Sequence, residues 1–284
     1  MSSLSSSDSQ GRIHPTSVIH PRAQLHESVR VGPHSVIGEH VQIGADTVIG
    51  PQVVIDGWTT IGERNQIFPG AVLGMEPQDL KYGGAATRLI IGNDNRIREY
   101  VTIHRATHAE EATVIGNENL LMAYVHVAHN CVIEDQVIIT NAVSLAGHIH
   151  IESQARIGGM VGIHQFTHIG KLAMVGAMSR IDRDVPPYMR VEGHPGRIRG
   201  LNLVGLKRAQ SAGISLTKLK AAYRVLYRSD LLLDKALQTL RDSADSQEIL
   251  HLLHFLEASL TQPQRRGPLP PQRGSRSADE TDAD

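Results

Sequence analysis

Four of the 16 histidines have neighbours and a spacing that would suit a catalytic or metal-binding site: His126, His129, His148 and His164. They occur in the segments YVHVAHNC, SLAGHIH and GIHQF. An imidazole with its ordinary pKa of about 6.5 is a suitable general base near neutral pH. The same spacing also fits a corner in which histidines bond to carbonyl groups, or a zinc site with histidine ligands. The elements that carry these residues decide what they can reach.

An aliphatic residue recurs every six positions from Ile13 to Ile181. Of the 29 positions in this register, 26 are Ile, Leu or Val, and the exceptions are Asp79, Ala85 and Ala109. A period of six fits neither the 3.6 residues of a helical turn nor the two-residue alternation of a strand. It predicts a β-helix of hexapeptide repeats, in which three short strands form an 18-residue coil and the aliphatic residues point inward.

The coil length predicts which histidines meet, because residues 18 apart stack on adjacent coils. His129 then lies beneath Gly147, and His148 is its diagonal neighbour with a Cα–Cα distance of roughly 6 Å. Glycine leaves an open notch with a backbone N–H facing the imidazole. A base beside an accessible N–H suits acyl transfer, which needs proton removal from a hydroxyl and stabilisation of an oxyanion. Spacing alone leaves the carbonyl-bonding corner and the zinc site open.

Two segments depart from the repeat. Residues 74–90 and 104–112 are polar and are predicted to leave the β-helix as loops, which in such folds are usually functional. After Pro187 the hexads stop and helical spacing begins. We therefore expect a disordered head at 1–10, the β-helix at 11–190, a small α-helical domain at 191–261 and a disordered tail at 262–284.

Charge and composition exclude several classes of protein. A net charge of −1 argues against a dedicated nucleic-acid binder. The single cysteine, Cys131, fits a reducing compartment and a packing role. No stretch approaches a membrane span, and the first residues lack a secretory apolar region, so a cytoplasmic protein is expected. Residues 191–228 nevertheless carry eight basic residues against Glu192, which indicates either a partner-binding face or a solvated helix face.

Longer motifs resemble a known family. The segments HPTSVIHP, QDLKY, IREYVTIHR, NLLMAYVHVAHNC, AGHIHI, IGGMVGIHQF, DVPPYM and NLVGLKR occur in this order. Over about residues 13–230, the chain resembles the bacterial acyl-[acyl-carrier-protein]–UDP-N-acetylglucosamine O-acyltransferases. The resemblance implies a mainly β fold, a left-handed parallel β-helix with a small C-terminal α-helical domain, assembled as a homotrimer with active sites between subunits. That handedness is opposite to the usual crossover preference.

The resemblance also implies a reaction. A (3-hydroxy)acyl group moves from the phosphopantetheine thioester of acyl-carrier protein to the 3-hydroxyl of UDP-N-acetylglucosamine, the first step of lipid A synthesis. No cofactor beyond the donor's phosphopantetheine and no metal is implied. The basic face at 191–228 would suit an acidic carrier protein and a diphosphate.

Site residues follow from the matching motifs. His129 takes the position of the general base, and Gly147 supplies the oxyanion N–H. The positions that contact substrate are Gln78, Asp79, Lys81, His126, His148, His164 and Gln165, with Asn202 and Arg208 at the nucleotide. Ala177 takes the position of the acyl-chain ruler, with Met174 as the alternative. Three departures are Asn130, where some members have Asp, Val204, where some have an acid, and Ala177, where some have glycine.

The sequence is compatible with several rival functions. Within the same fold they are an N-acyltransferase of a later lipid A step and an acetyl-CoA-dependent acetyltransferase, against which QDLKY argues. Outside it they are a zinc hydratase of the β-helical carbonic anhydrase type and a scaffolding β-helix. A scaffold would leave the 74–90 loop and the histidine cluster without a purpose.

Overall fold

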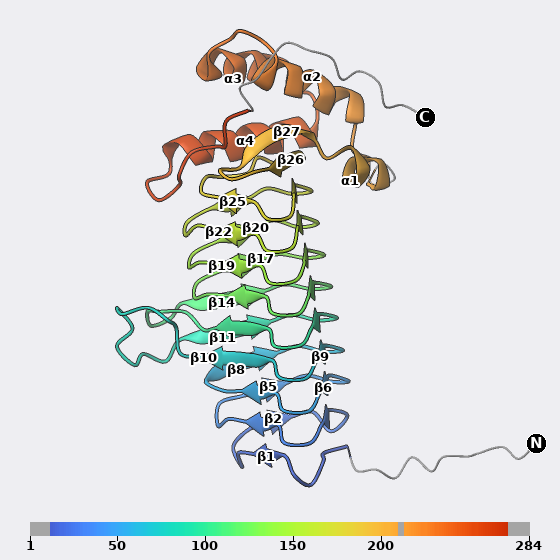
Figure 1. Ribbon diagram of the computed structural model, residues 1–284, viewed down its shortest axis with the longest axis vertical. Coiled ribbons are helices and arrows are strands. Elements are labelled where there is room, and N and C mark those ends of the chain that lie inside the picture. Colours follow the sequence, from blue (N-terminus) through green and yellow to red (C-terminus); the bar gives the residue numbers. More distant parts are fainter. Residues whose placement is uncertain (1–11, 210–212, 272–284) are drawn as a thin grey trace, which may run out of the picture.

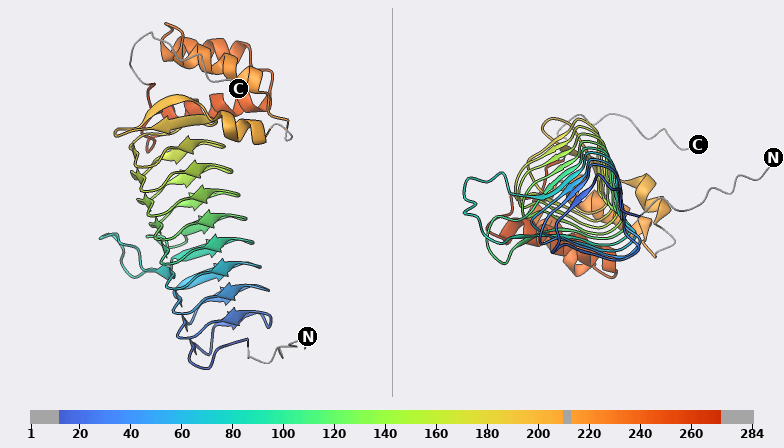
Figure 2. Two further views of the ribbon diagram at one scale, coloured as in Figure 1. Left: turned by 45° about the vertical axis from the view of Figure 1, so that its right-hand side comes forward. Right: turned by 90° about the horizontal axis from the view of Figure 1, so that it is seen from below.

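The six-residue repeat forms a three-sided β-helix, seen from the side in Figure 1 and along its axis in the right-hand view of Figure 2. The computed structural model describes residues 12–209 and 213–271. The repeat positions point inward, and Ile37, Ile55 and Ile103 are completely or almost completely buried. The predicted hexapeptide β-helix is thus confirmed.

The coils contribute strands to three sheets in the chain order sheet 1, sheet 2, sheet 3, and the last coil has only an isolated bridge between Val185 and Ile169 in place of a sheet 2 strand. Sheet 1 contains β1 (Val18–Ile19), β4 (Val36–Ile37), β7 (Val54–Ile55), β10 (Val72–Met75), β13 (Thr102–His104), β16 (His126–Val127), β19 (Ser144–Leu145), β22 (Gly162–Ile163) and β25 (Arg180–Ile181). Sheet 2 contains β2 (Gln24–Leu25), β5 (Gln42–Ile43), β8 (Trp58–Ile61), β11 (Arg88–Ile91), β14 (Ala112–Ile115), β17 (Val132–Ile133), β20 (His150–Ile151) and β23 (His168–Ile169). Sheet 3 contains β3 (Arg30–Val31), β6 (Val48–Ile49), β9 (Gln66–Ile67), β12 (Arg96–Ile97), β15 (Leu120–Leu121), β18 (Ile138–Ile139), β21 (Arg156–Ile157), β24 (Met174–Val175), β26 (Met189–Glu192) and β27 (Arg197–Leu201).

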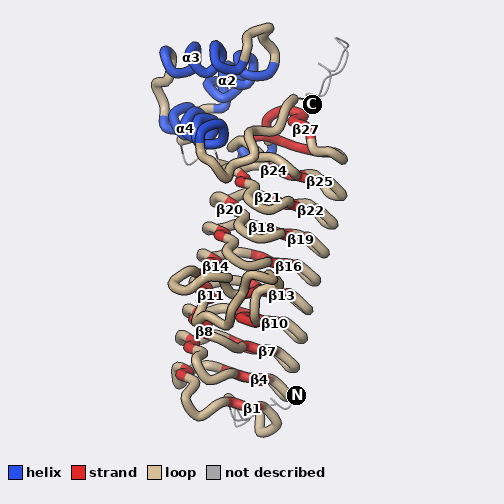
Figure 3. Tube along the Cα trace, turned by 90° about the vertical axis from the view of Figure 1, so that its left-hand side faces the viewer, coloured by secondary structure: helices blue, strands red, loops and turns tan. Residues whose placement is uncertain are grey.

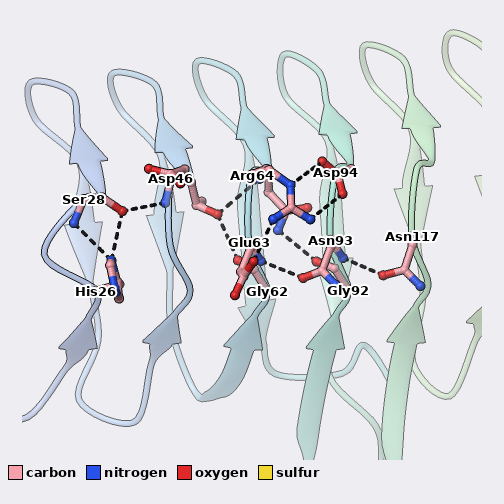
Figure 4. A network of polar contacts seen from close by, with 12 residues as sticks. His26, Ser28, Asp46, Gly62, Glu63, Arg64, Gly92, Asn93, Asp94 and Asn117 are labelled. Atoms are coloured by element: carbon pink, nitrogen blue, oxygen red, sulfur yellow. Dashed lines mark hydrogen bonds and ion pairs between the residues drawn. The ribbon is translucent and has the colours of Figure 1, made fainter.

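Polar ladders hold the corners between coils. In Figure 4, Asn93 accepts a hydrogen bond from the backbone of Glu63 at 2.8 Å, and Asn117 accepts one from the backbone of Asn93 at 2.8 Å. A Cβ on Gly62 would lie 2.3 Å from Oδ1 of Asn93, so glycine is required for this close approach. These bonds satisfy backbone groups that the two-residue strands leave unpaired.

The corner between sheets 1 and 2, called here the 1–2 corner, carries both predicted loops. One connects β10 to β11 and the other connects β13 to β14; the longer one projects from the side of the β-helix in Figure 1, and this side faces the viewer in Figure 3. Stacked residues are 18 apart elsewhere, but 30 apart across the first loop and 24 apart across the second. The insertions are therefore twelve and six residues long, and both are whole hexads.

A helical region covers the end of the β-helix, as expected. It consists of α1 (Leu203–Arg208), α2 (Leu216–Tyr227), α3 (Leu233–Asp242) and α4 (Gln247–Thr261). The sequence placed its start at 191, whereas β26 and β27 first form an antiparallel hairpin that extends sheet 3. Periodicity does not reveal a single hairpin between two repeating patterns.

The segment after α4 also differs from expectation. Disorder was predicted from 262, but residues up to 271 pack back onto the β-helix. Pro268 and Pro271 form bridges with Asp184 and Ile198, and Leu269 is almost completely buried. Arg265 donates from Nε to the buried Asp184 carboxylate at 2.6 Å. The predicted head at 1–10 and the rest of the tail lie outside the described residues.

Candidate active site

The 1–2 corner places His129 next to both inserted loops. His129 follows β16, one coil further along the axis than the β13–β14 loop. The β10–β11 loop brings Gln78, Asp79 and Lys81 to the same side of the three-sided β-helix. The sequence motif QDLKY and the motif HVAHNC are thus joined in space by the stacking of coils.

A buried arginine anchors the longer loop. Arg105, whose side chain is only 7% exposed, donates to the carbonyl of Gly74 at 2.9 Å and to the hydroxyl of Tyr82 at 2.7 Å. His104 Nδ1 lies 2.6 Å from the carbonyl of Glu76, which holds the first residues of the loop. Asp79 therefore sits on a fixed segment rather than on a free tip.

The imidazole of His129 is held on one nitrogen and open on the other. Its Nδ1 lies 2.9 Å from Oδ1 of Asn130 and 3.0 Å from Oγ1 of Thr107. Its Nε2 lies 3.8 Å from Oδ2 of Asp79, and the side chain is 13% exposed. Nε2 is therefore the nitrogen that could take a proton from a hydroxyl bound in the groove, as a general base must.

Residues of the next coil contact the imidazole of His129, as the 18-residue coil length predicts. The rings of His129 and His148 lie edge to face, with centroids 5.2 Å apart, and His148 stacks on Phe166 at 4.7 Å. A Cβ on Gly147 would lie 2.5 Å from Cε1 and 2.6 Å from Nε2 of His129. Glycine is therefore the residue that lets the backbone approach the imidazole this closely.

A groove of about 550 Å³ runs across sheet 1 beside this ring. Its floor includes Ser144 and Gly162, and an added Cβ on Gly162 would meet no atom within 4 Å. Of the residues predicted from the sequence, the groove is lined by Gln78, His126, His129, Gly147, His164 and Gln165. His148 and Asp79 contact His129 at its edge. Lys81 is exposed, and its backbone N–H donates to the Asp79 carboxylate at 3.0 Å.

The electrostatics favour neutral histidines beside an ionised carboxylate. Burial lowers the pKa of His104, His126 and His148. The hydrogen bond from the Lys81 backbone, with the nearby His129, lowers the pKa of Asp79. Near neutral pH, the neutral forms of His104, His126 and His148 are therefore favoured beside the ionised Asp79.

The other predicted residues lie elsewhere in the chain. Met174 points outward from sheet 3, and Ala177 is exposed at the corner between sheets 3 and 1, called here the 3–1 corner. Asn202 caps α1, accepting from the Gly205 backbone at 3.1 Å and donating to the Leu172 carbonyl at 2.8 Å. Arg208 is exposed at the end of α1. Within one chain, none of these four lines the His129 groove.

Several residues at the site were missed. Thr107 bonds to His129, Arg105 anchors the loop, His104 lines the groove, and Glu111 bonds to Asn130 at 2.7 Å. His104 and Arg105 end the motif IREYVTIHR and could have been singled out there. Thr107 and Glu111 lie in an insertion, where the repeat gives no register. Among residues 12–209 and 213–271, no three His, Cys, Asp or Glu side chains are grouped in a way that could hold a metal ion.

Comparisons with known proteins identify relatives of this chain. A family model described as "Udp N-acetylglucosamine O-acyltransferase; Domain 2" matches residues 184–268. The chain is 61% identical over 209 residues to the acyl-[acyl-carrier-protein]–UDP-N-acetylglucosamine O-acyltransferase of Gloeothece citriformis, covering 74% of this chain and 76% of that one. It is 48% identical over 250 residues to the enzyme of the same name from Myxococcus xanthus, covering 87% of this chain and 97% of that one.

A solved structure gives the same result for the fold. The UDP-N-acetylglucosamine acyltransferase of Francisella novicida superposes with a TM-score of 0.85 at 34% identity, covering 92% of this chain and 95% of that one. The predicted fold class, a left-handed parallel β-helix with a small C-terminal helical part, is confirmed.

Proposed function

This chain belongs to the acyl-[acyl-carrier-protein]–UDP-N-acetylglucosamine O-acyltransferase family, and from that premise we propose that it acylates the 3-hydroxyl of UDP-N-acetylglucosamine, the first step of lipid A synthesis. The acyl group comes from the phosphopantetheine thioester of acyl-carrier protein, and no cofactor resident on the enzyme takes part. The observation that carries the proposal is His129, with Nδ1 held at 2.9 Å by Asn130 and Nε2 open beside Gly147.

The geometry supports direct transfer. His129 Nε2 removes the proton of the sugar 3-hydroxyl while that oxygen forms a bond to the thioester carbon. The backbone N–H of Gly147 stabilises the oxyanion, and collapse breaks the carbon–sulfur bond as the imidazolium returns its proton to the leaving thiolate. Cys131 is buried, and burial raises the pKa of its thiol to about 12, which disfavours a covalent acyl-enzyme.

The groove and its loop supply the substrate contacts in this proposal. Gln78, Asp79 and Lys81 approach the sugar from the loop. His126, His148, His164 and Gln165 approach it from sheet 1 and the 1–2 corner. Asp79 also faces Nε2 of His129 at 3.8 Å, where its charge stabilises the imidazolium formed during transfer.

We infer a homotrimer whose sites lie between subunits. Residues assigned to one site occupy different sides of the prism, so they can meet only across two copies of the chain. The 3–1 corner supports this, because it exposes an apolar edge of Tyr100, Tyr124, Met160 and Met178, in which the two tyrosine rings stack at 5.2 Å. Leu80, in the longer inserted loop, is fully exposed as well. A fully active monomer in analytical ultracentrifugation would contradict this assembly.

The nucleotide and the donor would bind toward the helical end. Arg208 is exposed on α1 and suits a diphosphate, while Asn202 fixes the start of the same helix. Lys207, Lys220, Arg224 and Arg228 are also exposed and form, with Arg208, a basic face for the acidic carrier protein.

We place the enzyme in the cytoplasm, where its donor and its nucleotide sugar would be found. None of the helices in residues 12–209 and 213–271 has both the length and the apolar character needed to cross a membrane.

The test is incubation of the purified protein with 3-hydroxyacyl and unsubstituted acyl-carrier proteins and UDP-N-acetylglucosamine, with mass spectrometry of the nucleotide sugar. An acylated nucleotide sugar is expected, and His129→Ala should lower its rate of formation by about 10²–10⁴-fold. His14→Ala, which removes an exposed imidazole from the first coil, is the matched control. Turnover of acetyl-CoA without acylated nucleotide sugar, or CO2 hydration that depends on zinc, would overturn the proposal.

A further inference from the structure

Asn130 lies at the centre of a hydrogen-bond chain that starts in the shorter inserted loop. Its Nδ2 donates to Oε2 of Glu111 at 2.7 Å, and its Oδ1 accepts from the backbone N–H of Thr107 at 3.2 Å. The same Oδ1 lies 2.9 Å from Nδ1 of His129. Glu111 also accepts from the backbone N–H of His108 at 3.2 Å, which fixes the carboxylate.

These contacts determine where the proton of His129 resides. A carboxylate accepts hydrogen bonds and a main-chain N–H donates them, so the amide of Asn130 has one orientation that satisfies both neighbours. That orientation points Oδ1 at the imidazole. Because an amide oxygen only accepts, Nδ1 must carry the hydrogen, and Nε2 keeps its lone pair toward the groove.

The carboxylate also supplies charge. Burial alone would raise the pKa of Glu111, but the hydrogen bonds from Asn130 and from the His108 backbone outweigh it, so the pKa is lowered and the group is ionised near neutral pH. Position 130 itself carries no charge. Glu111 therefore places a negative charge at the far end of the amide that contacts His129.

Other titratable groups surround the same ring. Asp79 faces Nε2 at 3.8 Å, and His148 lies edge-on at 5.2 Å. His104 and His129 repel each other when charged, and His108 and His148 both interact with Glu111. Of the two carboxylates, Asp79 acts on the open nitrogen, and Glu111 acts through Asn130 on the held one.

We propose that Glu111 is a positioning residue for the reaction, acting through the Asn130 amide to fix the tautomer of His129 and to stabilise its imidazolium. The inference rests on the proposed function. One carboxylate at position 130 would both orient the His129 ring and supply a negative charge. In this chain, Asn130 orients the ring and Glu111 supplies the charge.

The first test replaces the charge and keeps the shape. Glu111→Gln is expected to lower kcat about tenfold, by analogy with the loss seen when a hydrogen-bond partner of a metal-bound histidine is removed, with little change in KM because Glu111 does not line the groove. The acidic limb of kcat/KM should move to lower pH, because an imidazolium with less support loses its proton more readily. Glu110→Gln, an exposed neighbour with the same change in charge, should leave kcat and the pH profile unchanged.

The second test exchanges the two groups. Asn130→Asp alone places two carboxylates within hydrogen-bond distance of each other, and should lower activity because one of them must bind a proton or move away. The double variant Glu111→Gln with Asn130→Asp restores one amide and one carboxylate, and is expected to recover kcat to within about threefold of wild type. The melting temperature of each variant checks the fold.

The outcomes separate the inference from its premise. If His129→Ala is inactive while Glu111→Gln keeps wild-type kcat and pH profile, the positioning role is wrong and the proposed base stands. A double variant no better than the worse single variant would also overturn the positioning role. If His129→Ala keeps wild-type activity, the proposed base itself fails.

Discussion

The close approach of Gly147 to His129 makes Gly147→Ala the sharpest perturbation of the site. The new Cβ would lie 2.5 Å from Cε1, whereas ordinary contact begins at 3.4 Å, so the imidazole must retreat by about 0.9 Å. The ring cannot do so freely, because Asn130 and Thr107 hold Nδ1. A misplacement of about 1 Å costs roughly 10²-fold in rate, or about 2.7 kcal/mol in the activation barrier.

The assay is kcat/KM with acyl-carrier protein as donor, measured with the melting temperature of the same preparation. We expect a fall of about 10²-fold at a nearly unchanged melting temperature. Gly200→Ala is the matched control, because its Cβ would meet no atom within 4 Å. If Gly147→Ala kept kcat/KM within threefold of wild type while folding normally, His129 would not be the base at this position.

Three further predictions concern binding, chain length and pH. Lys81→Ala should raise KM by about tenfold, as expected for one lost hydrogen bond to a charged group. Its melting temperature should stay unchanged because the side chain is exposed, and a clear fall in melting temperature would contradict this. Ala177→Gly should shift the preferred acyl chain by one or two methylenes toward longer donors, each worth about 0.8 kcal/mol when buried, and an unchanged optimum would assign the ruler to other residues such as Met174. Burial lowers the pKa of His168 below its ordinary 6.5, so the folded state favours the neutral ring and its contribution to stability is lost as pH falls below about 6.5. The melting temperature of His168→Gln should therefore decrease less than that of wild type between pH 7 and pH 5, and parallel curves would refute the assignment.

The sequence predicted what depends on the repeat. The six-residue period identified the buried positions, and the 18-residue coil placed Gly147 over His129 and His148 beside it, as the 5.2 Å ring separation confirms. Contacts made by insertions were not predictable in this way, because Thr107 and Glu111 have no register within a coil. The hairpin of β26 and β27 and the packing of Leu269 were missed for a related reason: each occurs once, so no period reports it.

The lengths of the two insertions suggest how this scaffold can diversify. The insertions at the 1–2 corner add twelve and six residues. They raise the sequence separation of stacked residues from 18 to 30 and to 24, and both increases are multiples of six, so every later strand keeps its alignment and its inward positions. A corner can therefore gain or lose whole hexads while the strands that fix His129 remain unaltered. Exchanging the segment between β10 and β11 for one of equal length from a relative would then test whether acceptor recognition moves with this loop, as the proposed function expects, while the backbone of His129 stays in place.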